Sequence, residues 1–264
     1  MSTLTYAVRD STTMLRRQFL HMRRYPSMTL MLVAIPVVFL LLFVYVFGGT
    51  LGAGLGGGPS GGRAEYVNYV TPGILLLTVA SGATSTAVSV AMDMTEGIIA
   101  RFRTMAIFRP SVLTGHVLGS MIQTMLSLAA VLAVALLVGF RPDATAVEWV
   151  AAAGVLAMMS FAMIWLAVVC GLVTRSVETA SNLPMPLFLL PFLGSGFVPT
   201  ESMPTALRWF AEYQPFTPVI ETVRGLLLGT GIGHHAVLAV AWSAGITVFC
   251  YGWAKKLYNR DRTT

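Results

Sequence analysis

Glycines at one place in the chain have the spacing of a nucleotide-binding loop. Gly52, Gly54 and Gly57 follow the pattern GxGxxG within a glycine-rich stretch, 48–62. A dinucleotide site needs a β-strand before these glycines and a helix after them, so that backbone N–H groups reach the phosphates. Here the stretch follows a long apolar run instead. We therefore assign no dinucleotide site to it, and its composition predicts a flexible external loop.

ATP hydrolysis by a P-loop requires a lysine directly after a glycine, because the ammonium group must reach the β- and γ-phosphates. The chain has only two lysines, Lys255 and Lys256, and they follow Ala254. The sequence therefore holds no ATP site of this type. We expect that the chain is not an enzyme and binds no cofactor of its own.

Histidines and cysteines are the remaining residues with potential chemistry. His234 and His235 are adjacent at a predicted membrane boundary, where an interfacial position is a commoner role than metal binding. Cys170 and Cys250 both lie inside apolar stretches, so we expect neither a disulfide nor a metal site. No catalytic set of Ser, His and Asp stands out.

The elements that position these residues must be membrane helices. Of 264 residues, 56% are hydrophobic and 11% are charged, whereas about 25% are charged in an ordinary soluble domain. A soluble protein of this composition would expose apolar patches large enough to aggregate. The net charge of +6 is divided among short segments between apolar runs, so it indicates no nucleic-acid surface.

Apolar runs of about 20 residues predict six membrane spans. The fifth is short and contains four prolines, so we expect it to be kinked or broken. The charged segment 200–235 follows it and predicts short re-entrant helices at the external interface. The six predicted spans are 28–47, 70–92, 117–139, 147–173, 183–199 and 236–254.

Lysine and arginine counts predict the orientation of these spans. One side of the membrane has thirteen of these residues and the other has four. Basic residues are enriched on the cytoplasmic side, so both termini are predicted to be cytoplasmic. The spans contain almost no Asp, Glu, Lys or Arg, which weakens the alternative of a gradient-driven carrier or channel because such proteins bind ions near mid-membrane.

Two amphipathic segments are predicted on the cytoplasmic side. Residues 12–25 place apolar and basic side chains on opposite arcs, as in a helix lying on the membrane surface. It could be a lipid anchor or a lever docked on a partner. Residues 94–108 lie between spans two and three, and Asp93 followed by Glu96 resembles a capping box. A helix this short is marginal alone, so it either docks on a partner or is a solvated loop helix.

Two stretches of the chain have a distinctive sequence. The first comprises 97–105 (GIIARFRTM) and 109–115 (RPSVLTG), and the second comprises 194–204 (GSGFVPTESMP) and 215–225 (PFTPVIETVRG). Both resemble segments of a known family, the ABC-2 type permeases of the daunorubicin-resistance kind. The resemblance covers essentially the whole chain. It implies a single all-α transmembrane domain over 1–264, with a cytoplasmic amphipathic helix in 1–27, a six-span bundle in 28–254 and a cytoplasmic tail in 255–264.

The resemblance also implies partners and sites. Members of this family work with separate cytoplasmic ATPase subunits, which bind ATP and Mg, and pair with a second permease copy or paralogue in the bacterial cytoplasmic membrane. The cargo would be an amphipathic drug, lipid or glycolipid. The implied contacts to the ATPase are Asp93, Glu96, Gly97, Arg101, Phe102, Arg103, Arg16 and Arg17. The implied substrate path or gate comprises Ser81, Ser85, Phe188, Phe192, Phe197, Glu221 and Arg224.

Overall fold

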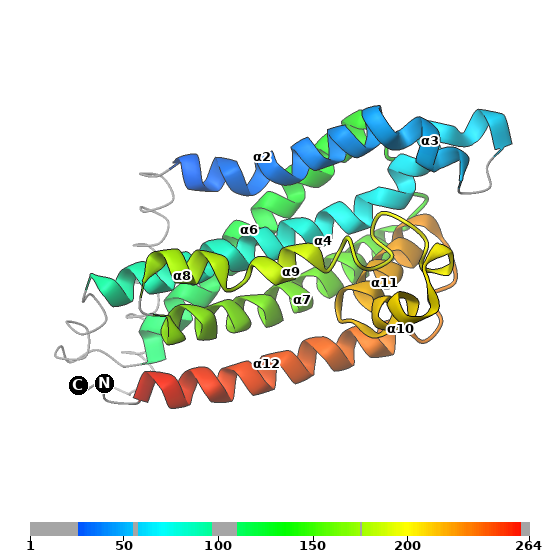
Figure 1. Cartoon of the computed structure of the whole chain (residues 1–264). Coiled ribbons are helices and arrows are strands. Elements are labelled where there is room, and N and C mark those ends of the chain that lie inside the picture. Colours follow the sequence, from blue (N-terminus) through cyan, green and yellow to red (C-terminus); the bar gives the residue numbers. More distant parts are fainter. Residues whose placement is uncertain (1–25, 55–57, 97–109, 175, 260–264) are drawn as a thin grey trace.

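A computed structural model describes residues 26–54, 58–96, 110–174 and 176–259, and no strand occurs among them. Helices run lengthwise in a bundle, and five of them are long and apolar enough to cross a membrane. Figure 1 shows that α2 begins and α12 ends at the same end of this bundle. That arrangement supports the prediction that both ends of the chain lie on one side. The five membrane-spanning candidates are Leu30–Ala53, Gly62–Thr95, Thr114–Val138, Ala146–Val173 and His235–Leu257.

These helices contain five of the six predicted spans. The first is α2, which continues through a π-helical turn, η1, and the short helix α3. The next three are α4, α6 and α7, and the last is α12. Their bounds are Pro26–Leu42 (α2), Phe43–Phe47 (η1), Gly48–Ala53 (α3), Gly58–Thr95 (α4), Pro110–Val138 (α6), Ala146–Val173 (α7) and His235–Asn259 (α12).

The predicted fifth span is broken, as its prolines indicate. Its residues form α9 (Met185–Leu189) and turns that continue to residue 198, and the short helix α8 (Val177–Asn182) directly precedes it. Both short helices contact α4. In Figure 1 the segment runs beside α4, from the end where α7 stops to the end where α12 begins. It passes along the bundle without being one of the five long helices, so the count of six crossings stays a prediction.

Two further helices lie between the broken segment and α12. They follow a single 3-10 turn, η2 (Thr200–Ser202), and gather at the end of the bundle predicted to be external (Figure 1). The first, α10 (Thr205–Tyr213), is mostly exposed, and the second, α11 (Phe216–Leu228), is mostly buried. On α10 the Arg208 guanidinium donates to Glu212 at 2.6 Å, and this hydrogen bond raises the pKa of Arg208 above its ordinary value.

The glycine-rich stretch is largely helical, so the predicted flexible loop is wrong for the residues that the structure describes there. Helix α3 occupies Gly48–Ala53, and α4 already begins at Gly58. A Cβ atom added to Gly52 would lie 1.8 Å from the carbonyl oxygen of Gly62. The absence of side chains therefore allows the two backbones to touch, and this packing outweighs the poor helix propensity of glycine.

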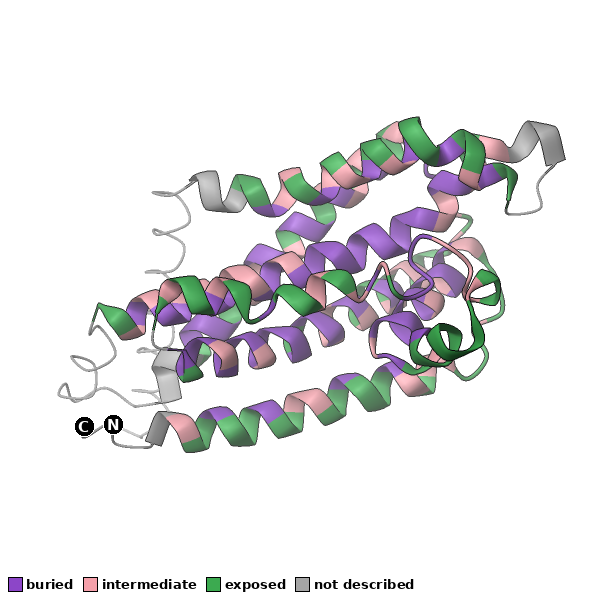
Figure 2. Cartoon of the chain, viewed as in Figure 1, coloured by how far each residue is buried: buried purple, intermediate pink, exposed green. Residues whose placement is uncertain are grey.

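Helix α4 forms the centre of the bundle. Within its span, 72% of the most apolar stretch is buried, against 17% in the span of α12. Figure 2 shows the same contrast as a mostly purple α4 and a mostly green α12. Helices α2, α6, α7, α8 and α11 all contact α4. Most side chains of α4 therefore pack against other helices of this chain, whereas most side chains of α12 face outward, where lipid would lie.

Candidate functional site

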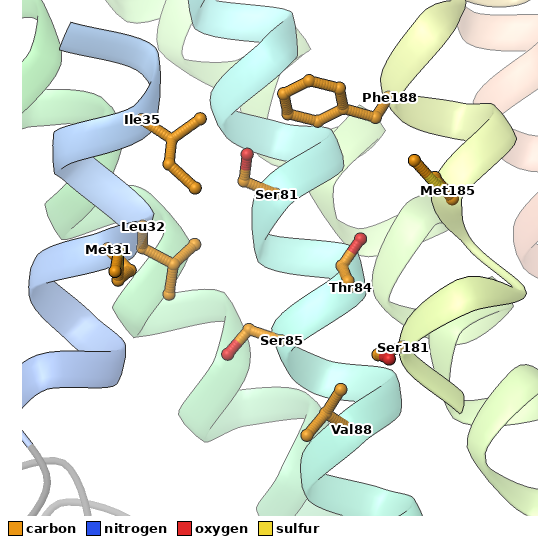
Figure 3. Close-up of a pocket in the computed structure, with 10 residues that line it drawn as sticks. All are labelled: Met31, Leu32, Ile35, Ser81, Thr84, Ser85, Val88, Ser181, Met185 and Phe188. Atoms are coloured by element: carbon orange, nitrogen blue, oxygen red, sulfur yellow. The ribbon is translucent and has the colours of Figure 1, made fainter. Parts of the chain in front are cut away.

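A groove opens on one face of α4, between α2 on one side and the α8–α9 segment on the other (Figure 3). Its volume is about 530 Å³, within the usual range for small-molecule pockets. The lining combines apolar side chains with four hydroxyl groups, and none of the described residues that line it is charged. The lining residues are Met31, Leu32, Ile35, Ser81, Thr84, Ser85, Val88, Ser181, Met185 and Phe188.

Three of the four hydroxyl groups in the groove donate hydrogen bonds to backbone carbonyls of their own helices. Ser81 donates to the carbonyl of Leu77 at 3.0 Å, and Thr84 donates to that of Ala80 at 3.3 Å. Ser181 donates to the carbonyl of its own helix at 2.8 Å. A hydroxyl that gives away its proton keeps lone pairs that can accept hydrogen bonds.

Three predicted path residues, Ser81, Ser85 and Phe188, meet in this groove although they come from segments about a hundred positions apart. The predicted substrate path does not include the α2 wall or Thr84. Thr84 has the same small polar character as its neighbours on α4, and that pattern was a usable signal. Contact with α2 depends on packing between distant segments, which no local pattern records.

Aromatic rings close the space next to the groove, toward the predicted external end. Phe192 stacks on Phe197 with ring centres 4.3 Å apart and planes inclined by 4°. The ring centre of Phe39 in α2 lies 5.5 Å from that of Phe192, and the ring centre of Phe43 in η1 lies 4.5 Å from that of Phe197. Phe188 connects this aromatic cluster to the groove, since it lines the groove and lies 6.0 Å from Phe39. The predicted path residues Phe192 and Phe197 are therefore contiguous with the groove.

Beyond the aromatic cluster, Arg224 holds the irregular segment against α4. Its guanidinium is buried, donates to the carbonyls of Ser195 at 2.7 Å and Tyr69 at 3.1 Å, and lies over the Tyr69 ring. It also pairs with Glu221 one turn earlier in α11. The two charged residues predicted at the gate, Glu221 and Arg224, are thus paired with each other, and Arg224 contacts α4.

Further hydrogen bonds complete this arrangement, which we call the polar lock. Tyr69 donates to the carbonyl of Ser195 at 3.0 Å, and Tyr66 donates to that of Phe197 at 3.2 Å. The Gln214 amide donates to the carbonyl of Leu190 at 3.0 Å. The polar lock comprises Tyr66, Tyr69, Gln214, Glu221 and Arg224.

The polar lock explains how non-helical backbone is accommodated inside an apolar bundle. Residues 190–198 lack a continuous helical ladder, and unsatisfied carbonyls at membrane depth cost several kcal/mol each (about 2–7 kcal/mol for a polar group). Side chains from α4 and α11, and Gln214 between α10 and α11, supply the missing donors. Close contact is possible because Gly73 faces Gly196, where a Cβ on Gly73 would lie 2.5 Å from the Gly196 carbonyl oxygen.

At the opposite end of α4, Asp93 forms a buried pair with His116. The His116 Nε2 atom lies 2.9 Å from the Asp93 carboxylate, and both side chains are at least nine-tenths buried. Asp93 lies inside α4, which continues to Thr95, so its predicted role as the cap of a following helix is wrong. The Asp93 carboxylate, which the local pattern assigned to capping, instead pairs with His116 of α6.

Most residues predicted to contact an ATPase lie outside the described residues. These are Arg16, Arg17, Gly97, Arg101, Phe102 and Arg103, together with the predicted helix 12–25 and residues 97–108 of the predicted helix 94–108. Residues 94–95 belong to α4. Glu96 is described, directly after α4, and is exposed. Asp93 is buried in its pair with His116. Within the described ranges, no group of three His, Cys, Asp or Glu side chains could hold a metal ion.

Comparisons with known proteins identify the family. Residues 10–228 match the model of the ABC-2 type transporter family. The chain is 28% identical over 254 residues to a daunorubicin resistance ABC transporter permease protein, DrrB1, of Streptomyces coeruleorubidus, covering 96% of this chain and 87% of that protein. It is 24% identical over 184 residues to a probable doxorubicin resistance permease, DrrC, of Mycobacterium tuberculosis, covering 69% and 66%. The chain therefore belongs to the ABC-2 type transporter family, as a membrane-embedded permease.

Proposed function

We propose that this chain is the permease subunit of an ATP-binding cassette exporter that moves an amphipathic drug, lipid or glycolipid outward. A separate cytoplasmic ATPase would bind and hydrolyse ATP with Mg, and a second permease copy or a paralogue would complete the membrane part. Family membership supports the ATPase partner. The names of the relatives, which refer to daunorubicin and doxorubicin resistance, support an amphipathic cargo.

The groove carries this proposal. It lies beside the half of α4 that ends at Thr95, the end predicted to be cytoplasmic, so cargo could enter it from the cytoplasm or the inner leaflet. Its walls belong to α2, α4 and the α8–α9 segment, and the last of these is the part of the bundle with the least helical continuity. A wall of short helices can move without breaking one long helix, because its helical hydrogen-bond ladder is already interrupted.

The aromatic cluster would act as the barrier above the groove. Cargo that leaves toward the external end must pass between Phe39 on α2 and Phe192 on the broken segment, which now lie 5.5 Å apart. Aromatic contacts of this kind contribute about 0.5–1.5 kcal/mol each beyond burial. A few such contacts can be opened by the binding and hydrolysis of ATP, whereas the charge-assisted contacts of the polar lock are stronger and would serve as the fixed end of the segment.

The ATPase would drive this movement from the predicted cytoplasmic end of α4 and α6. These two helices flank residues 97–109, and the buried Asp93–His116 pair joins their ends. A push on the connecting segment would therefore reach both helices as a unit. Since α4 contacts α2 and the α8–α9 segment, its tilt would change both walls of the groove.

Purification in mild detergent with mass identification of the bound chains tests the proposed assembly. The expected result is an ATPase bound to the permease, no ATP hydrolysis by the permease alone, and transport only when both are present with ATP. Transport by the isolated chain in liposomes without nucleotide would instead identify a gradient-driven carrier or channel. Charge reversal at Glu96, as Glu96→Lys, should reduce ATP-driven transport without preventing membrane insertion.

A further inference from the structure

The groove offers a ligand more hydrogen-bond acceptors than donors, and this imbalance restricts what it can bind. Ser81, Thr84 and Ser181 give their protons to backbone carbonyls, so toward a ligand they present lone pairs. Within the described part of the chain Ser85 makes no hydrogen bond, so its hydroxyl proton stays available to a ligand. In Figure 3, Ser81 and Ser85 lie on the α2 side of α4 and Thr84 lies on the α8–α9 side. Acceptors thus face the groove from both sides.

The described residues of the groove also offer no counter-ion to a charged ligand. Its lining contains no Asp, Glu, Lys, Arg or His among the residues that the structure describes there. An ion taken from water into such surroundings loses much of its favourable hydration, even where the bilayer adapts around it. Contact of a cation with the π-face of Phe188 is weaker than this loss and does not offset it. A fixed charge on the ligand is therefore disfavoured.

We infer, on the basis of the proposed function, that the groove binds an uncharged amphipathic molecule through hydroxyl or amide donors on its polar part. The apolar part packs on Met31, Leu32 and Ile35, and the donors meet the hydroxyl oxygens of α4. A glycolipid-like molecule has this chemistry. Among the described lining residues, a ligand whose polar part offers acceptors alone finds one donor, Ser85, and a permanently cationic ligand finds no carboxylate.

Three probes of equal chain length separate these cases. They are a dansyl-labelled decyl glucoside, the same compound with its hydroxyls permethylated, and a dansyl-labelled decyltrimethylammonium salt. Each is titrated onto the full chain in nanodiscs, with empty nanodiscs subtracted. Two or more hydrogen bonds, at about 0.5–1.5 kcal/mol each, predict that the glucoside binds about tenfold more tightly than either other probe. Equal or tighter binding of the permethylated or ammonium probe would overturn the inference.

A matched pair of variants locates the site. Thr84→Val replaces the hydroxyl with a methyl group of similar size and should weaken glucoside binding by about threefold to tenfold, leaving the permethylated probe unchanged. Thr86→Val is the control, because Thr86 also donates to its own helix, at 2.8 Å, but does not line the groove. Ser81→Ala, which removes another acceptor oxygen of the groove, supplies a second test if Thr84→Val fails to fold. Equal effects of the groove and control variants would contradict the assignment.

The remaining outcomes are also decisive. If no probe binds and a cysteine introduced at Thr84 forms a disulfide between two copies of the chain, the groove is a contact between permeases and the inference is wrong. Selective glucoside binding without an associated ATPase would refute the proposed function while supporting the ligand class. An associated ATPase without glucoside selectivity would refute the ligand class alone.

Discussion

The guanidinium carbon of Arg224 lies 3.9 Å from the centre of the Tyr69 ring, and the same guanidinium donates to the Tyr69 carbonyl. One side chain of α11 thus contacts both the face of an aromatic residue and the backbone of the central helix. Because it also binds the Ser195 carbonyl, it connects three segments that are far apart in the sequence. This contact holds the broken segment against α4 at the end of the bundle predicted to be external.

Replacement of Arg224 by lysine should destabilise the protein although the charge is kept. An ammonium group cannot reach two carbonyls and a carboxylate while lying flat on a ring. We expect the loss of charge-assisted hydrogen bonds to lower the free energy of unfolding by about 2–4 kcal/mol. Thermal unfolding in detergent measures the effect, with Arg208→Lys on exposed α10 as the control. Equal midpoints for the two variants would contradict the role given to the polar lock.

Gly73→Ala should separate α4 from the irregular segment. The new methyl group would lie 2.5 Å from the Gly196 carbonyl oxygen, so one backbone must move. Overpacking of this kind costs about 1–3 kcal/mol. Gly154→Ala is a matched control, because a Cβ there meets nothing within 4 Å and alanine favours the helix by up to about 1 kcal/mol. We expect the unfolding midpoint to fall in Gly73→Ala and to rise in Gly154→Ala, and a fall of the same size in both would contradict the close contact at Gly73.

Phe192→Ala should open the aromatic cluster. The variant loses ring contacts to Phe39, Phe43 and Phe197 in a single substitution. We expect faster leakage of a fluorescent amphiphile through reconstituted protein in the absence of ATP, because the barrier above the groove is removed. Phe249→Ala, on the exposed face of α12, should leave leakage unchanged. Unchanged leakage in Phe192→Ala would place the barrier elsewhere.

The Asp93–His116 pair should show strong energetic coupling in a double-mutant cycle. Both side chains are buried and 2.9 Å apart, so we expect a coupling free energy of about 1–3 kcal/mol between Asp93→Asn and His116→Gln. The exposed Arg208–Glu212 pair offers a comparison, because solvent screens a surface pair of this type and leaves only weak coupling. Similar coupling in the two cycles would argue against a firm connection between α4 and α6.

Features governed by local pattern could be predicted from the sequence. Long apolar runs gave the membrane helices, and the prolines of 183–199 gave the break, because both depend on residues adjacent in the chain. Asp93 was misassigned because the same carboxylate suits a helix cap and a distant histidine, and only the fold decides between them. The polar lock was missed in part because Tyr66, Tyr69 and Gln214 carry no signal until backbone carbonyls from residues 190–197 are placed beside them.

ATP-driven transport by reconstituted complexes tests the central claim most directly. Inside-out proteoliposomes holding the permease and its co-purified ATPase are supplied with ATP and a panel of neutral and cationic fluorescent amphiphiles. We expect uptake to require ATP and both chains. Ser85→Trp, which fills the groove, should abolish uptake, whereas Val147→Trp on the exposed surface of α7 should leave it unchanged. Uptake by the permease alone without nucleotide, or undiminished uptake by Ser85→Trp, would contradict the central claim.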